Sequence, residues 1–361
     1  MKYIDEYRNK DLVMRLADSV KKEVRRNYSF MEVCGGHTAA IHRFGIPSLL
    51  PDNVRLISGP GCPVCVTGTS FIDRAIEYSK RKEVIIATFG DMIRIPGTAS
   101  SLEKEKATGA DIRIVLSGLE ALEIAKGYPG KIIIFLGIGF ETTAPGTAVT
   151  VLHAEREKTQ NFFLLSAHKV MPPAMEAILK DGVMLDGFIC PGHVATITGS
   201  SVFEFIPEKY NLGCVISGFE PADILLSILL LVHQTNSNNP RVEIQYNRAV
   251  RIEGNPIARN FMSEVFEYCD APWRGLGIIP QSGLTLRKEF ERFDAVKKIP
   301  LEIISDGDND LCICGKILRG VKTPGECPLF ADICFPENPI GACMVSTEGA
   351  CNTWYKYKPV I

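Results

Sequence analysis

The 361-residue sequence lacks three features that would assign it to a broad functional class. It has no long run of Lys and Arg, and its formal net charge is −2, so binding to nucleic acid is not expected. Its longest apolar stretch, Ile224–Val232, is interrupted by Ser227 and is shorter than the roughly 20 residues of a membrane-spanning helix. The first residues, MKYIDEYRNKDLV, are charged where a signal peptide would be apolar. We therefore expect a soluble, cytoplasmic protein with no nucleic-acid or membrane partner.

Cysteine, by contrast, is abundant, with 12 residues. A secreted disulfide framework is typical of short, loop-rich chains, and this chain is neither. We interpret the cysteines as metal ligands and redox thiols in a reducing compartment, and not as structural crosslinks. Six of them lie between Cys312 and Cys351, and three lie near the N-terminus, at Cys34, Cys62 and Cys65. The scattered Cys190, Cys214 and Cys269 are interpreted as small buried hydrophobic residues.

Short β-branched runs, each followed by a helical pattern, recur along the chain. They lie at 54–61, 84–91, 112–118, 131–139, 161–167, 187–190 and 214–218. Continuous apolar strands that alternate with helices indicate parallel sheets covered on both faces. The predicted fold class is therefore α/β, with two doubly wound parallel-sheet domains and a small Cys-rich iron–sulfur domain.

The pattern predicts four segments. Residues 1–30 form an N-terminal segment with an amphipathic helix at 11–25, which we expect to pack on the C-terminal domain. Residues 31–155 and 156–300 form the two α/β domains, divided where 151–160 resembles a helix end and a crossing point. Residues 301–361 form the Cys-rich domain, which has little apolar surface to bury and would gain stability from a metal.

Reactive side chains follow the ends of several predicted strands. Ligands of doubly wound folds bind beyond the carboxyl ends of the strands. We therefore expect a shared cleft lined by thiols, carboxylates and imidazoles. The residues at these ends are Cys62, Cys65, Asp91, Glu141, Thr142, Thr143, His168 and His193.

The motif CGGHT places His37 three residues after Cys34. Its two glycines let the backbone approach a ligand closely, and His37 could act as a base for the thiol or as a second donor. A buried thiol beside a turn is the alternative, and this motif alone slightly favours it.

The motif GPGCPVC contains a C-x-x-C, Cys62 and Cys65, at a predicted strand-to-helix turn. Helix amides lower the pKa of a nearby thiol, so this pair could exchange disulfides or bind a soft metal. Half of a zinc site is the alternative. Four-thiolate zinc usually needs a second C-x-x-C, which the chain lacks, so redox or iron chemistry is favoured.

The tail contains six thiols, at Cys312, Cys314, Cys327, Cys334, Cys343 and Cys351. Four cysteinates suit a [4Fe–4S] cluster, which would leave two thiols as a redox pair beside it. A structural zinc with two spare thiols is the alternative, since spacing alone does not distinguish the metals.

The stretch GIGFETT, at 137–143, is similar to a dinucleotide-binding loop, because Gly137 and Gly139 follow an apolar strand. Thr142 stands where such a loop has its third glycine. We interpret the stretch as a polar ligand loop with Glu141 facing the cleft. A dinucleotide oxidoreductase is thereby disfavoured.

Taken together, these stretches resemble the HypD family of hydrogenase formation proteins. The matching strings run from residue 31 nearly to the end of the chain: MEVCGGHT (31–38), GPGCPVC (59–65), ATFGDM (87–92), GIGFETTAP (137–145), PGHVATITG (191–199), ISGFEP (216–221) and the tail CICGKILRG, CPLF and NPIGACMVSTEGAC. Their order and joint presence are very specific.

The resemblance implies a role in building the Fe(CN)2CO unit of [NiFe]-hydrogenases. It implies a small partner, HypC, with the iron held between the two proteins while cyanide arrives from the HypE–HypF branch, and the hydrogenase large subunit is a further partner. The implied fold is two α/β domains plus a [4Fe–4S] domain similar in surroundings to ferredoxin:thioredoxin reductase.

The resemblance also implies site residues. The family pattern maps the cluster ligands to Cys312, Cys327, Cys334 and Cys351. Cys314 and Cys343 are then a redox pair that forms one reversible, functional disulfide.

The implied iron site lies at the N-terminal motifs. Cys34 and one or both of Cys62 and Cys65 bind the iron, with His37 assisting and electrons arriving from the tail thiols. Glu348 tunes the redox pair or relays a proton. Asp91, Glu141 and His193 are cleft residues for iron, cyanide transfer or partner contact.

Two other functions remain open at this stage. A stand-alone iron–sulfur dithiol–disulfide reductase would use the same thiols without Fe(CN)2CO. A structural zinc protein with a small-molecule α/β site would need neither redox pair nor cluster. Whether the protein is a catalyst or an assembly scaffold is likewise left open by the sequence.

Overall fold

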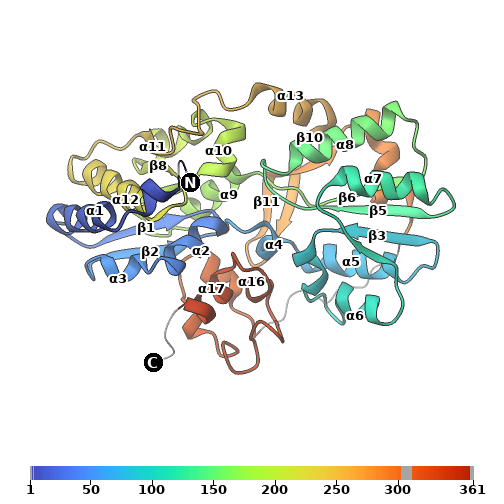
Figure 1. The fold of residues 1–361 in the computed structure, drawn as a ribbon, viewed down its shortest axis with the longest axis horizontal. Coiled ribbons are helices and arrows are strands. Elements are labelled where there is room, and N and C mark those ends of the chain that lie inside the picture. The colour runs from blue at the N-terminus through green and yellow to red at the C-terminus, as the bar shows by residue number, and fades with distance from the viewer. Residues whose placement is uncertain (1, 3, 302–310, 358–361) are drawn as a thin grey trace.

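The computed structural model describes residues 2, 4–301 and 311–357. Two parallel sheets lie side by side, a two-stranded antiparallel ribbon lies between them, and the Cys-rich tail packs beneath (Figure 1). The five-stranded sheet has the order β2 (Val54–Ser58), β1 (Tyr28–Glu32), β7 (Gly187–Pro191), β8 (Gly213–Ser217) and β9 (Val242–Ile244). The four-stranded sheet has the order β4 (Ile112–Ile114), β3 (Val84–Thr88), β5 (Ile132–Gly137) and β6 (Phe162–Ser166). The ribbon is β10 (Phe266–Trp273) and β11 (Gly277–Leu286).

Helices cover the sheets, and short helices occur in the tail. The α-helices are α1 (Lys10–Glu23), α2 (Gly35–Arg43), α3 (Ile46–Leu49), α4 (Pro63–Val66), α5 (Thr69–Ser79), α6 (Leu102–Ala107), α7 (Gly118–Gly127), α8 (Ala144–Arg156), α9 (Met171–Lys180), α10 (Gly192–Thr198), α11 (Phe205–Tyr210), α12 (Pro221–Asn236), α13 (Pro256–Val265), α14 (Ala295–Lys298), α15 (Cys314–Leu318), α16 (Ala342–Val345) and α17 (Ala350–Tyr357). Short 3₁₀ helices are η1 (Asp5–Arg8), η2 (Gly90–Arg94), η3 (Ser201–Phe203), η4 (Lys288–Phe293) and η5 (Pro324–Glu326). Across the described residues, none of these helices has the length and apolar content needed to cross a membrane.

The strands are apolar on both faces because helices cover both faces of each sheet. In β3, Ile85 packs with α7 and α8, whereas its neighbours Val84 and Ile86 pack with α5. This alternation follows the two-residue period of a strand. The α/β fold class and all seven predicted strands are thereby confirmed.

The sheets do not follow the expected division of the chain at 155/156. β6 comes after that point and pairs with β5, while β1 and β2 pair into the sheet that contains β7 and β8. A crossover helix can return the chain to either sheet, so sequence order does not fix which strands share a sheet. The expected start of the Cys-rich domain at 301 adjoins 302–310, which lie outside the described residues.

The N-terminal helix packs differently from our expectation. α1 lies against α12, and their buried residues, Val20 and Ile228 among them, share one apolar cluster with β1. The expected contact with the C-terminal domain is therefore wrong. The apolar face of α1 packs on α12, which has the larger apolar surface and contains the core helix predicted at Ile224–Val232.

We expect Val20→Ala to lower the free energy of unfolding by about 1–3 kcal/mol, because it removes two buried methyl groups from the α1–α12 interface. Met14→Ala on the exposed side of the same helix should change it by less than about 0.5 kcal/mol. Urea unfolding followed by circular dichroism measures both variants. Equal losses in the two would contradict this packing.

Candidate functional site at the sheet edge and tail

The N-terminal motifs meet because their strands are neighbours. β1, β7 and β8 are adjacent and parallel, so their carboxyl ends lie along one edge of the five-stranded sheet. Cys34 follows β1, His193 follows β7 and Phe219 follows β8. β2, on the other side of β1, leads into Cys62. This edge is where ligands of doubly wound sheets bind.

The Cys-rich tail packs directly on this edge (Figure 1). α16, which contains Cys343, contacts α4, which contains Cys65, and α17 contacts α2. Glu348 lies so close to Gly35 that a Cβ at Gly35 would stand 2.7 Å from the Cβ of Glu348. Only glycine therefore fits at this first position of α2.

Cys34 lies at the N-terminus of α2, against the GPGCPVC loop. Gly35 donates a backbone hydrogen bond to Gly61 O at 2.9 Å, and a side chain at Gly61 would collide with the backbone of Cys34. The two glycine-containing motifs thus hold Cys34 next to the C-x-x-C pair.

The surroundings of Cys34 disfavour a free thiolate. Burial, followed by the charges of Glu348 and Glu32, raises the pKa of the Cys34 thiol to about 12. The helix amides of Gly36 and His37 act in the opposite direction but are outweighed. This thiol would ionise at neutral pH only when a cation binds beside it.

Glu32 is a site residue that the sequence analysis missed. Its buried carboxyl group accepts a hydrogen bond from the backbone N–H of Cys34 at 3.0 Å and another from the Thr38 hydroxyl. Burial raises the pKa of Glu32 to about 8. The feature of the sequence that could have identified Glu32 is its position at the end of β1, two residues before Cys34.

Cys62 and Cys65 are joined by a disulfide, with their Cα atoms 5.2 Å apart. Cys314 and Cys343 are free thiols, so the expectation that the single disulfide would join those two differs from the structure. The three-residue spacing across the first turn of α4 brings the two sulfurs together locally, within the usual range for a disulfide. The bond is buried, as are both of its cysteines.

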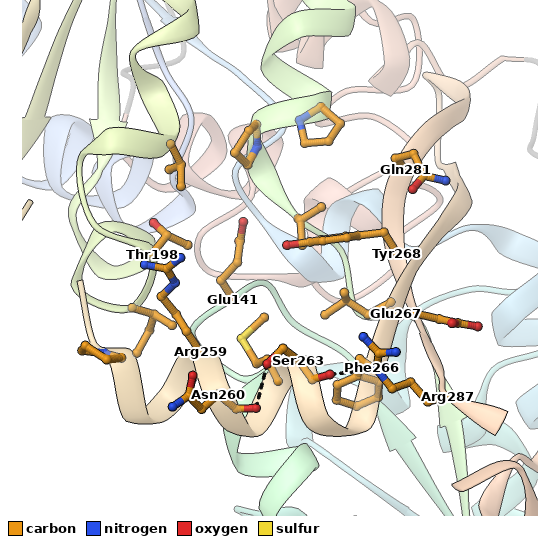
Figure 2. Close-up of a pocket in the computed structure, with 18 residues that line it drawn as sticks. Glu141, Thr198, Arg259, Asn260, Ser263, Phe266, Glu267, Tyr268, Gln281 and Arg287 are labelled. Carbon is orange, nitrogen blue, oxygen red and sulfur yellow. Dashed lines mark hydrogen bonds between the residues drawn. The ribbon is translucent and has the colours of Figure 1, made fainter. Parts of the chain in front are cut away.

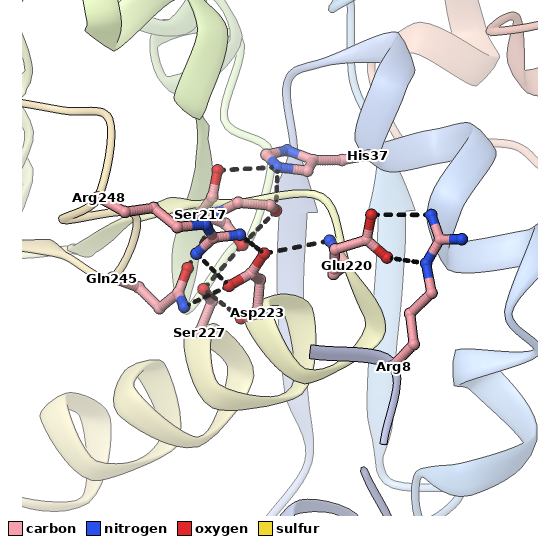
Figure 3. Close-up of polar contacts among 9 residues, drawn as sticks. Arg8, His37, Ser217, Glu220, Asp223, Ser227, Gln245 and Arg248 are labelled. Atoms are coloured by element: carbon pink, nitrogen blue, oxygen red, sulfur yellow. Dashed lines mark hydrogen bonds and ion pairs between the residues drawn. The ribbon is translucent and has the colours of Figure 1, made fainter. Parts of the chain in front are cut away.

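His37 points toward the end of β8, as Figure 3 shows. Its Nε2 donates to Ser217 O at 3.2 Å and to Gly218 O at 3.0 Å, which leaves Nδ1 buried and without a partner among the described residues. Burial lowers the pKa of His37 to about 4, so the ring is neutral. Phe219 stacks between His37 and His193, at ring distances of 4.5 and 3.9 Å.

A buried ionic network fixes the carbonyl groups that hold His37 (Figure 3). Asp223 accepts from Arg248 and from Gln245, the latter at 2.8 Å, and Gln245 Oε1 accepts from the N–H of Gly218 at 2.9 Å. Arg8 closes the outside of the network by pairing with Glu220. A buried network satisfied in this way is rigid, so it fixes the edge beside Cys34.

Asp91 and Glu348 are neighbours at the rim of the tail. Loss of surrounding water, followed by the charge of Asp91, raises the pKa of Glu348. Asp91 is exposed and lines a pocket of about 850 Å³ at the carboxyl edge of the four-stranded sheet, together with Val64 and Thr142.

Glu141 lines a different pocket, of about 810 Å³, with Arg259 and Tyr268 at its walls (Figure 2). One oxygen of its buried carboxyl group accepts from the N–H of Met171 at 2.9 Å, and the other has no partner among the described residues. Glu141 and Asp91 thus line two separate pockets, and not one cleft. His168 is a buried core residue that bonds to Thr147 and Ser166.

All six tail thiols line one small pocket. Its other walls are apolar and include Ile317, Leu329 and Met344. The Cys314 thiol is a hydrogen-bond neighbour of both Cys312 and Cys343. The cavity between these side chains has a volume of only about 10 Å³. The thiols are suitable ligands for a cluster, whereas their present spacing is too close to hold one.

Among the described residues (2, 4–301 and 311–357), no three or more His, Cys, Asp or Glu side chains are arranged to hold a single metal ion. The site places Cys34, Cys62 and Cys65 against the Cys-rich tail. Its described side chains do not form a ready-made site for one metal ion. Such an arrangement can exchange electrons between thiols and can gain a thiolate ligand when a metal arrives.

The pKa of Glu141, raised by burial from 4.5 to about 7, predicts a pH-dependent stability. The stabilising contribution of the protonated carboxyl group is fully present below pH 4.5 and is lost as the pH rises through 7. Relative to Glu141→Gln, the wild type should lose up to about 1.4 kcal/mol per pH unit in this window and level off above it. Urea unfolding at several pH values measures the difference, and parallel curves would contradict the raised pKa.

We expect mild oxidation of the metal-free protein to join Cys314 to Cys343, because their thiols are already hydrogen-bond neighbours. The other neighbour of Cys314, Cys312, is only two residues away in the chain, so a disulfide between them would close a small, strained ring. Peptide mass spectrometry after alkylation of free thiols identifies the product. Cys343→Ala should leave Cys314 alkylated. A bond between Cys312 and Cys314 as the main wild-type product would contradict this geometry.

Known proteins are similar to this chain over nearly its whole length. The family model described as "HypD: Hydrogenase formation hypA family" matches residues 9–358. The chain is 46% identical to the hydrogenase maturation factor HypD of Cupriavidus necator, over 99% of the chain and 97% of that protein. The HypD of Azotobacter vinelandii is also 46% identical over the same shares. The Escherichia coli HypD is 41% identical, over 99% and 98%. The chain therefore belongs to the HypD family of hydrogenase maturation factors.

Proposed function

We propose that this protein is the scaffold on which an iron ion acquires cyanide and CO ligands for the [NiFe]-hydrogenase active site. It would act in the cytoplasm with a HypC-like small chaperone, receive cyanide from HypE and pass the product toward the hydrogenase large subunit. The observation that carries the proposal is the packing of α16 on α4 and of Glu348 on Gly35, which places the Cys-rich tail against the segment of Cys34.

The iron is the cargo, and Cys34 is its first proposed ligand. The raised pKa of the Cys34 thiol means that a bound cation, and not the protein, must favour the thiolate. Glu32, whose carboxyl group contacts the backbone of Cys34, is not the acceptor of the proton, because its pKa, raised by burial to about 8, keeps it mostly protonated at neutral pH. His37, neutral and fixed by its Nε2, offers the lone pair of Nδ1 as an acceptor.

Cys62 and Cys65 become iron ligands only after their disulfide opens. Thiol–disulfide exchange with Cys314 and Cys343 would transfer two electrons and two protons, leaving two thiols at the C-x-x-C and a disulfide in the tail. The contact between α16 and α4 supports this route, because exchange passes through a mixed disulfide and requires the sulfurs to meet.

The tail is the proposed site of a resident [4Fe–4S] cluster, with Cys312, Cys327, Cys334 and Cys351 as ligands. These four thiols line the same apolar pocket, and burial raises the pKa of Cys334 and Cys351, so they too need a cation to ionise. A bound cluster supplies one-electron redox chemistry. Cys314 and Cys343 remain as the dithiol pair.

Partner contact is proposed at the pocket that Asp91 lines. Leu116 and Ile257 at this pocket are 85% and 68% exposed, which is unusual for large apolar side chains and suits an apolar face of the HypC-like chaperone. His193, exposed above Phe219, lies on the Cys34 side of the five-stranded sheet and is a proposed contact for the cyanide donor.

Infrared spectroscopy of the protein isolated anaerobically with its small partner tests the proposal. We expect cyanide and CO stretching bands in the wild type and at least a tenfold loss of their intensity in Cys34→Ala, because the first iron ligand is gone. Cys269→Ala is the matched control, since Cys269 is also a half-buried free thiol but lies in the ribbon. Cyanide and CO bands of wild-type intensity in Cys34→Ala would show that Cys34 is not the essential ligand.

A stand-alone dithiol–disulfide reductase is the second candidate, and the Cys62–Cys65 disulfide beside free Cys314 and Cys343 favours it. It predicts turnover on a disulfide substrate by protein that contains no Fe(CN)2CO. Turnover without infrared bands would favour the reductase over the scaffold.

A further inference from the structure

A second pocket, of about 330 Å³, opens beside the tail thiols and is basic. Its charged lining residues are all cations, namely Arg274, Lys316 and Arg319. None of the lining residues is an Asp or a Glu. Cys312 and Cys314 also line the thiol pocket. This basic pocket is therefore a route from the surface to the redox thiols, and the proposed function does not yet use it.

Two glycines build the basic pocket. The turn between β10 and β11 places Gly275 at a φ of +73°, against Gly315 at the start of α15, and a Cβ on either glycine would collide with the backbone of the other. The contact places Arg274 in the wall of the same pocket as Cys312 and Cys314. Arg274 is 8% exposed and donates to Thr69 Oγ1 at 2.6 Å, so its charge is fixed in place.

The mouth of the basic pocket combines exposed charge with an exposed apolar side chain. Lys316 is exposed, and Val321, whose N–H donates to Lys316 O, is 61% exposed. Arg319 pairs with Asp181 at 3.5 Å, with both side chains well exposed, so this pair is weak and leaves the mouth positive. Steering by charge with a small apolar contact is typical of transient electron-transfer complexes.

We propose that the basic pocket is the docking surface for a small acidic protein that carries single electrons to the tail site. The proposal rests on the redox role given to the tail under the proposed function. Two carrier molecules, each oxidised by one electron, and two protons from water would reduce one Cys314–Cys343 disulfide to two thiols. The carrier would approach through the basic pocket, whose described lining contains cations and no carboxylates and includes Cys314.

Binding by the full chain tests the surface without depending on turnover. The probe is a plant-type [2Fe–2S] ferredoxin, an acidic one-electron carrier, at low ionic strength. Lys316→Glu with Arg319→Glu should weaken its Kd at least tenfold, and Lys316→Glu alone, which keeps the Arg319–Asp181 pair, should weaken it severalfold. Lys21→Glu with Lys22→Glu on α1 makes the same change in charge elsewhere and should leave the Kd within twofold. High salt should remove the differences.

Electron delivery separates this proposal from the proposed function. The protein is first oxidised mildly, because Cys314 and Cys343 are free thiols in the structure. Alkylation and mass spectrometry then count the thiols formed at these two residues after reduction by ferredoxin or by reduced methyl viologen, a small cation that gains nothing from a basic pocket. The double variant should slow delivery from ferredoxin at least tenfold and leave delivery from viologen unchanged. If viologen works and the double variant matches the α1 control with ferredoxin, only the docking surface is wrong. If viologen produces no thiols in the wild type, the redox role of the tail fails, and the docking proposal fails with it.

Discussion

The site depends on the close approach of three backbones at the N-terminus of α2. Gly61 lies against the backbone of Cys34, and Gly35 lies against Glu348 of the tail, with no room for a side chain at either glycine. Gly61 contacts the backbone of Cys34, and Gly35 contacts the Cβ, Oε2 and backbone O of Glu348, so van der Waals contact sets the distance between the tail and the N-terminal motifs. A methyl group at either position would separate Cys34 from the C-x-x-C loop or from the tail.

The same contact creates an unusual electrostatic environment. Desolvation is the main cause that raises the pKa of Glu32, Glu348 and Cys34. The charge of Glu348 raises the pKa of Glu32 and of Cys34 further, and the charge of Asp91 does the same for Glu348. Groups that would become anions are gathered where water is scarce, which is costly unless a cation binds or the groups stay protonated. A metal cation that bound among such groups would displace protons from them, and only reduced thiols could serve as its ligands.

The five-stranded sheet explains why motifs far apart in the sequence act together. Its strands come from 28–58 and 187–244, and the order of β1, β7 and β8 aligns their carboxyl ends. Phe219 then stacks on His37 and His193 across the edge, and the Asp223 network fixes the carbonyl groups behind His37. The rigidity of the edge comes from hydrogen bonds that are buried and satisfied, while the Cys-rich tail is attached by packing.

The sequence by itself determined the fold class, the seven main strands and the cysteine groups, because strand periodicity and motif spacing are local properties of the chain. It missed β1, whose YSFME mixes polar and apolar residues, and the ribbon 266–286, which contains Gly, Pro and charged residues. Only the tertiary structure decided which strands share a sheet, that Glu141 and Asp91 line separate pockets, and that Glu32 and Phe219 flank Cys34. Those outcomes depend on crossover connections and on packing between distant segments, which no window of sequence contains.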